Sequence, residues 1–219
     1  MPRTATAHPS TATRSPLTDP LSDPHAELDR QLDVLVDAGV PAAAGVSAAA
    51  LRRRVQSLHD VVEQVEERPF VLVLPDLVPG EVAVGLTRLR GKTGFTTMEP
   101  DDLARFRPTA DVDLPGAQAY LSVEPDTGRT WLDVPPEQVL PSLLESGRTP
   151  LTLDEGLALL LQDGEVLRRD TCFSMLAARC GDRRVPALWV SKGRPRLGWC
   201  WDGAPHTWLG SGSAAYRLG

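Results

Sequence analysis

The pattern of apolar residues changes near residue 69, and this change constrains the fold more than any other feature of the chain. Before that point, two segments repeat leucine and valine at the three- and four-residue spacing of an amphipathic helix. After it, short β-prone runs alternate with further helical segments, and Gly and Pro separate them. Helices followed by many short strands predict an α+β fold, in which helices pack on a mixed or antiparallel sheet.

The first two helices are expected to form a helical hairpin. One begins near Asp23 and stops at Gly39 and Pro41, and the other is capped by Ser47 and ends before Pro69. Because the link between them is short, the helices should be neighbours. The apolar stripes consist of Leu28, Leu32, Leu35 and Val36 in the first helix, and of Leu51, Val55, Leu58, Val62 and Val65 in the second.

The rest of the chain predicts short elements. Strands are expected at 70–74 and 81–89, a helical turn at 101–106, and a β-hairpin from 119–123 and 130–134. A short helix should follow Pro135 and end at Gly147, and Thr152 and Glu155 have the spacing of a capping box at the start of another. From Cys172 onward we expect three or four antiparallel strands.

Composition separates an N-terminal tail from the rest of the chain and disfavours membrane and exported proteins. Residues 1–24 are rich in Pro, Thr, Ser and Ala and predict a disordered tail, which leaves residues 25–219 as a single domain. The absence of an 18-residue apolar run and of a secretory signal pattern disfavours a membrane span and export. Three cysteines, an odd number, favour reduced thiols and a cytoplasmic protein.

The charge is unevenly distributed. A net charge of -6 argues against nucleic-acid binding, which needs many Lys and Arg facing phosphate. Residues 171–219 nevertheless contain seven basic and two acidic residues, a local charge of +5, together with four of the five Trp. This segment either pairs with the acidic remainder of the protein, or it attracts a small anionic ligand or an acidic protein surface.

These tryptophans and arginines form the candidate binding site. In a strand, Trp199 and Trp201 point to the same face, and His206 and Trp208 repeat that parity. Large aromatic residues more often fill a core, but Trp beside Arg and His also builds a ligand pocket. Within the site, a pairing of Asp182 with a neighbouring Arg as a turn lock is favoured over free anion-binding arginines. The candidate ligand-binding residues are Asp182, Arg183, Arg184, Trp189, Trp199, Trp201, His206 and Trp208.

Two motifs for phosphate and metal binding fail on spacing. Gly91-Lys92-Thr93 resembles the end of a phosphate-binding loop, but Leu86 stands where the first Gly is required, and the following residues start a helix poorly. We therefore interpret the tripeptide as a basic turn. A zinc site is disfavoured because two of its thiols would lie roughly 26 Å apart along one strand. Its four candidate ligands are Cys172, Cys180, Cys200 and His206, and buried inert thiols, with no metal and no cofactor, are the favoured interpretation.

Catalytic patterns are also weak. Cys180 near arginines, with His206 in the same region, has the composition but no spacing that establishes a thiol nucleophile and its base. The acidic pairs Asp101-Asp102 and Asp154-Glu155 stand where helix N-termini favour acids, so capping explains them.

Several long strings in the last third resemble an actinobacterial family of uncharacterised proteins, the domain of unknown function 5701 family. They include the segment from Arg148 to Thr152, the segment from Arg179 to Trp189, the Leu197-Gly198-Trp199-Cys200-Trp201 string, and the segment from Pro205 to Gly210. The likeness extends from about Ala26 to Arg217 and is densest after Arg148. The family implies no activity, cofactor or catalytic residue.

The sequence therefore favours a binding or accessory protein whose C-terminal Trp and Arg residues hold a small anionic ligand or an acidic partner. One alternative is an enzyme with a cleft built from Cys180, Asp182, Arg183, Arg184 and His206. The other is a structural or oligomeric protein that uses the N-terminal helical hairpin as its contact.

Overall fold

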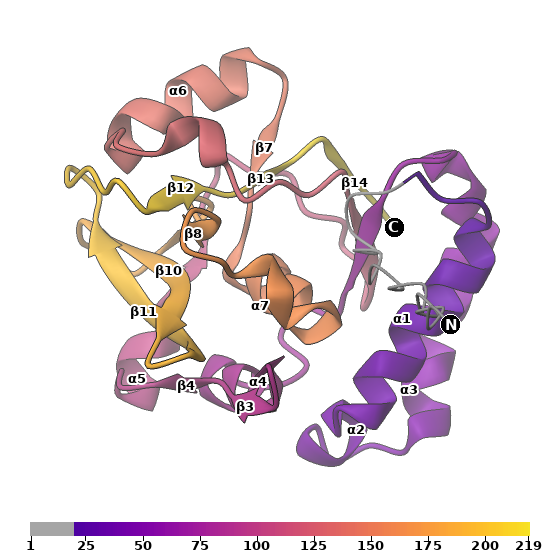
Figure 1. Cartoon of the computed structure of the whole chain (residues 1–219). Coiled ribbons are helices and arrows are strands. Elements are labelled where there is room, and N and C mark those ends of the chain that lie inside the picture. Colours follow the sequence, from indigo (N-terminus) through magenta and orange to yellow (C-terminus); the bar gives the residue numbers. More distant parts are fainter. Residues whose placement is uncertain (1–19) are drawn as a thin grey trace, which may run out of the picture.

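The computed structural model describes residues 20–219 and confirms an α+β fold (Figure 1). The predicted tail falls almost wholly on residues 1–19, which lie outside the described residues, and the single domain over 25–219 stays a prediction. The helices are α1 (Pro24–Asp37), α2 (Val40–Ala43), α3 (Ala48–Val55), α4 (Gly80–Leu86), α5 (Pro100–Leu103), α6 (Pro136–Glu145) and α7 (Leu153–Gln162), with 3-10 turns η1 (Gln56–Asp60), η2 (Val62–Val65), η3 (Arg129–Trp131) and η4 (Gly164–Val166).

The strands form one five-stranded sheet, one three-stranded sheet and three short pairs. The larger sheet has the order β12-β8-β10-β11-β4 and the smaller one β1-β6-β14. The strands are β1 (Phe70–Val73), β2 (Arg88–Leu89), β3 (Lys92–Thr93), β4 (Phe95–Thr96), β5 (Arg107–Pro108), β6 (Tyr120–Val123), β7 (Thr149–Pro150), β8 (Cys172–Ser174), β9 (Ala178–Arg179), β10 (Arg184–Ser191), β11 (Arg194–Trp201), β12 (Leu209–Ser211), β13 (Ser213–Ala214) and β14 (Tyr216–Leu218).

The N-terminal helices form a layer beside the three-stranded sheet, on the far side of the molecule from β10 and β11 (Figure 1). The predicted N-cap at Ser47 is confirmed, since its side chain accepts a hydrogen bond from Ala50 N at 3.1 Å. The second helix stops being α-helical after Val55 and continues as η1 and η2, yet its whole apolar stripe is buried. The apolar pattern thus predicted which residues face the sheet, but it did not predict the type of helix.

A glutamine joins this helical layer to the sheet. Strand β1 lies at a sheet edge, so some of its backbone groups lack a neighbouring strand. Gln31 of α1 replaces that strand: its amide nitrogen donates to Phe70 O, and its amide oxygen accepts from Leu72 N, both at 2.7 Å. Gln162 of α7 then donates to Gln31 O at 3.0 Å. These bonds satisfy buried polar groups that would otherwise destabilise the fold.

Three element predictions were wrong. Residues 81–89 are mainly helix α4, because Pro79 starts a helical turn and the buried Ala83 and Val84 pack against α7. No hairpin joins 119–123 to 130–134, because β6 already pairs with β1 and β14 on its two sides. The region after Cys172 contains seven strands rather than three or four, and the pairings β12–β8 and β11–β4 are parallel.

The five-stranded sheet is covered on both faces. Val185 and Ala187 of β10 pack in a cluster with Val139 and Leu143 of α6. Leu188 of the same strand packs instead in the cluster that contains the apolar side of α7. This alternation is the two-residue period of a strand that is buried on both faces.

The capping box at α7 is confirmed and has a second role. Thr152 accepts from Glu155 N at 3.2 Å, and Glu155 accepts from Thr152 N at 2.7 Å. The fully buried Glu155 carboxylate also accepts two hydrogen bonds from the guanidinium of Arg217, at 2.7 and 2.8 Å. This ion pair ties β14, and with it the three-stranded sheet, to α7.

Candidate functional site

The eight predicted ligand-binding residues fall into two groups. The first contains Trp199 and Trp201, which share a face of β11 as predicted, with ring centroids 4.9 Å apart. Both are partly open to solvent, at 37% and 53% exposure. Arg184 of β10 lies on the same side, with its guanidinium 5.6 Å from the Trp199 ring centroid.

The arginines of this group are bound to acids. Arg184 Nε donates to Asp182 at 2.9 Å, and its terminal nitrogens donate to both oxygens of Asp102. These bonds lower the pKa of both carboxyls: for Asp102 the Arg184 side chain is the main cause, and for Asp182 it is the backbone amide of Arg184. Arg183 is paired with Glu137. The predicted turn lock is confirmed, and Arg184 is a structural brace here rather than a free anion-binding group.

The enzyme cleft predicted around Cys180 does not come together as a nucleophile and its base. The Cys180 thiol donates to Asp182 at 3.1 Å, and within residues 20–219 no hydrogen bond links His206 to either residue. Burial raises the pKa of the Cys180 thiol, which disfavours the reactive thiolate. All three cysteines are free and buried, and burial raises the pKa of Cys200 to about 12. No group of three or more His, Cys, Asp or Glu in the described part of the chain is arranged to hold a metal ion.

The second group contains Trp189 of β10 with His206 and Trp208, lies on the opposite face of the sheet from Trp199, and belongs to a row of aromatic rings and arginines. Trp189 and Trp208 contact edge to face, with centroids 6.1 Å apart, and the His206 ring lies 5.3 Å beyond Trp208. On the other side of Trp189, the Arg196 guanidinium lies 5.2 Å from its ring centroid and 5.7 Å from that of Phe95. The row, which we call the cation–π row, consists of Arg194, Phe95, Arg196, Trp189, Trp208 and His206.

The two arginines of this row are not neutralised by acids. Arg194 donates to Thr93 O at 2.7 Å, and Arg196 donates to Thr97 Oγ1 at 3.0 Å. Neither forms an ion pair with a carboxylate of residues 20–219, and Arg196 Nε is buried without a hydrogen-bond partner. Their positive charge therefore persists beside Phe95 and Trp189, in a protein whose net charge is -6.

Trp189 and Trp208 form one wall of a cavity of about 950 Å³, which we call the indole–arginine cavity. Arg90, Arg168 and Arg169 line it, and the acid in the lining, Asp170, is held by Arg129 at 2.7 Å. Arg90 is paired with Glu165, but Arg169 has no hydrogen bond or ion pair with any residue of 20–219. The full lining is Leu89, Arg90, Leu167, Arg168, Arg169, Asp170, Cys172, Trp189, Val190, Gly193, Thr207 and Trp208.

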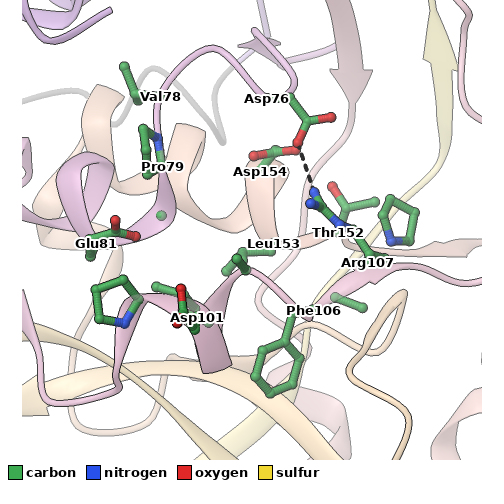
Figure 2. A pocket seen from close by; sticks show the side chains of 16 residues that line it. Asp76, Val78, Pro79, Glu81, Asp101, Phe106, Arg107, Thr152, Leu153 and Asp154 are labelled. Atoms are coloured by element: carbon green, nitrogen blue, oxygen red, sulfur yellow. Dashed lines mark hydrogen bonds and ion pairs between the residues drawn. The ribbon is translucent and has the colours of Figure 1, made fainter.

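A second cavity, of about 400 Å³, lies between α4, α5 and the start of α7 and is shown in Figure 2. We call it the carboxylate cavity because Asp76, Glu81, Asp101 and Asp154 line it, together with Arg107 and apolar side chains. Asp76 and Asp154 point toward each other in Figure 2, and Arg107 donates to Asp76 at 3.3 Å. Burial, and next the negative charge of Asp76, raise the pKa of Asp154 to about 6.

Sequence reasoning missed most of what lines both cavities. Arg90, Arg168 and Arg169 precede the basic segment that drew attention to residues 171–219, and only the folded chain brings them beside Trp189 and Trp208. Asp154 was recognised as a capping acid, but its partner Asp76 stands in a loop after β1, with no motif around it. No signal in the sequence joins these two carboxyls.

The comparisons with known proteins identify a family but no relative of known activity. A family model described as a family of unknown function, DUF5701, matches residues 34–219. No curated protein and no solved structure matches the chain. Among residues 20–219, no helix has the length and apolar character that crossing a lipid bilayer requires.

Proposed function

The chain belongs to the DUF5701 family, whose function is unknown, and from the geometry of its indole–arginine cavity we propose that it is a binding protein for a small anionic ligand. The observation that carries this proposal is the unpartnered Arg169 in a cavity walled by Trp189 and Trp208. Guanidinium groups bind carboxylate and phosphate oxygens in pairs, and indoles supply apolar surface. The proposed ligand-binding residues are now Arg168, Arg169, Trp189 and Trp208.

Not all residues of the sequence-based site belong to this proposal. His206 is a neighbour of Trp208 rather than a proposed ligand contact, since its ring packs against the Trp208 ring. Trp199 and Trp201 remain exposed on the other side of the sheet, where Asp102 and Asp182 neutralise Arg184. Arg183 is neutralised by Glu137. An acidic protein partner would find little free positive charge there. We also assign the protein to the cytoplasm, because its three buried cysteines are unpaired.

Isothermal titration calorimetry with inorganic phosphate, sulfate, acetate and benzoate tests the proposal. Arg169→Gln should weaken binding of the best anion about tenfold, since it removes a charge-assisted hydrogen bond without changing the protein core. Arg183→Gln is the matched control, because Arg183 lies outside the cavity and is paired with Glu137. Absence of binding by all four anions would refute an anion site.

The carboxylate cavity favours a second candidate function, an enzyme that uses acid–base catalysis. Asp154, with a pKa of about 6, can hold a proton near neutrality, while the neighbouring Asp76 is exposed and forms an ion pair with Arg107. Two carboxyls with such different environments can serve as acid and base. Chromogenic esters, glycosides and phosphate esters test this candidate. An enzyme of this kind should hydrolyse at least one of these substrates, and Asp154→Asn should abolish the hydrolysis. Equal rates for the wild type and the variant would exclude the acid–base function.

A further inference from the structure

The rim of the indole–arginine cavity holds a residue that the proposed function has not used. Residues 91–93 were excluded as a phosphate-binding loop, and in the structure they form a tight turn and strand β3. Arg90 and Gly91 both have positive φ, at 49° and 78°, which closes the β2–β3 hairpin. This turn places Arg90 in the cavity lining and brings Lys92 to its edge.

The position of Lys92 follows from its neighbour. Gly193 lines the cavity in the β10–β11 turn, and a methyl group added to it would lie 3.3 Å from Lys92 Nζ. The Lys92 side chain forms no hydrogen bond or ion pair with residues 20–219. The β2–β3 hairpin and the Arg168-Arg169 segment therefore both bring cations to the cavity.

The charge of this rim fits an anion with more than one negative charge. Arg168, Arg169 and Lys92 have no carboxylate partner among residues 20–219, whereas Arg90 and Asp170 are already paired with Glu165 and Arg129. Three free cations exceed what a single carboxylate needs, and phosphate groups carry the additional charge. The hairpin thus supplies a lysine for phosphate without the helix that a phosphate-binding loop requires.

The indole wall fits a flat ring. Trp208 is 38% exposed, so part of its ring surface is free for stacking. Trp189 contacts Trp208 edge to face and fixes the orientation of its ring. The cation–π row behind Trp189 holds that ring in place through Arg196. Stacking on an aromatic side chain is favourable for every nucleobase, because each base has a π-face. A ligand that uses both features has a planar ring at one end and phosphate at the other.

We infer that the anionic ligand of the indole–arginine cavity is a free nucleoside phosphate, with its base on Trp208 and its phosphate groups between Lys92, Arg168 and Arg169. This inference rests on the proposed function and narrows it to one class of ligand. A cavity of about 950 Å³ has room for such a molecule.

Calorimetry with adenosine 5′-monophosphate, adenosine, inorganic phosphate and a single-stranded oligonucleotide tests the assignment. We expect the nucleotide to bind at least about tenfold more tightly than adenosine or phosphate. Adenosine can contact only the indole wall of the cavity, and phosphate can contact only the cations. Trp208→Ala should reduce the nucleotide to the affinity of phosphate, Lys92→Gln should weaken nucleotide and phosphate alike, and Arg183→Gln should change neither.

Each other outcome is informative. If phosphate binds as tightly as the nucleotide, the nucleotide assignment is wrong and the anion site stands. If neither phosphate nor the simple anions bind, the proposed function fails together with this inference. If the oligonucleotide binds more tightly than the mononucleotide, the assignment to a free nucleotide is wrong. If Trp208→Ala leaves nucleotide affinity unchanged, the base does not stack where the structure requires.

Discussion

Replacing Asp154 by Asn should stabilise the protein near pH 7 and leave its stability almost unchanged near pH 3. In the folded protein, burial and the neighbouring Asp76 raise the pKa of Asp154 from 3.8 to about 6. The folded state therefore holds the proton more tightly than the unfolded chain does. The contribution of Asp154 to the free energy of unfolding is therefore highest below pH 3.8 and falls as the pH rises through 6, as proton linkage requires.

The size of the effect follows from the two pKa values. At 1.36 kcal/mol for each tenfold change in proton affinity, an ionised Asp154 destabilises the folded protein by at most about 3 kcal/mol at neutral pH. Asn has nearly the shape of a protonated Asp and carries no charge. It can still accept the hydrogen bond that the Asp76 backbone amide donates to this side chain. The variant should thus retain the contacts and lose the pH-dependent penalty.

Urea denaturation of both proteins between pH 3 and 8 measures this difference. Because other carboxyls titrate in both proteins, the informative quantity is the stability of the variant minus that of the wild type at each pH. Asp101→Asn removes one negative charge from the same cavity and controls for a general charge effect. A difference that is constant with pH, or a variant that is less stable at pH 7, would show that ionised Asp154 does not destabilise the folded protein.

The remaining predictions concern the residues that hold the fold together. Glu155→Gln should cost about 3–5 kcal/mol, because it leaves the Arg217 guanidinium, 4% exposed, without its ionised partner; an unfolding experiment in urea that finds a cost below 1 kcal/mol contradicts it. Gln31→Leu should cost about 1–3 kcal/mol for each backbone group left unpaired at the β1 edge, and hydrogen exchange should increase at Leu72 but not at β10. Arg184→Ala should lower the melting temperature by several degrees while anion affinity, measured by calorimetry, stays constant; the reverse pattern would make Arg184 a ligand-binding group.

The fold was predictable where local chemistry decides it. The cap at Ser47 and the capping box of Thr152 and Glu155 follow from hydrogen bonds within one helical turn, so the sequence contains both partners. Residues 81–89 were not predictable in this way, because their apolar run is compatible with a strand or a helix. Packing of Ala83 and Val84 against α7, distant in sequence, selects the helix.

The candidate site was predictable only in part, for a similar reason. The crowding of Trp residues in the basic C-terminal segment pointed to Trp189 and Trp208, which do line a cavity. Arg183 and Arg184 were predicted as binding residues, but the sequence could not reveal Glu137 and Asp102 as their partners, because these acids are distant in the chain. The cations at this cavity that lack an acid partner, Lys92, Arg168 and Arg169, could not be identified from the sequence, because only the folded chain pairs Arg90 with Glu165 and Asp170 with Arg129.

Native mass spectrometry of the protein purified from its own host can show whether the indole–arginine cavity holds a ligand, when the native mass is compared with the mass of the denatured chain. We expect a retained small anion in the wild type and in Arg183→Gln, and its loss in Arg169→Gln and Trp208→Ala. A bare wild-type chain, or a ligand that remains on all three variants, would contradict the assignment of the indole–arginine cavity as the binding site.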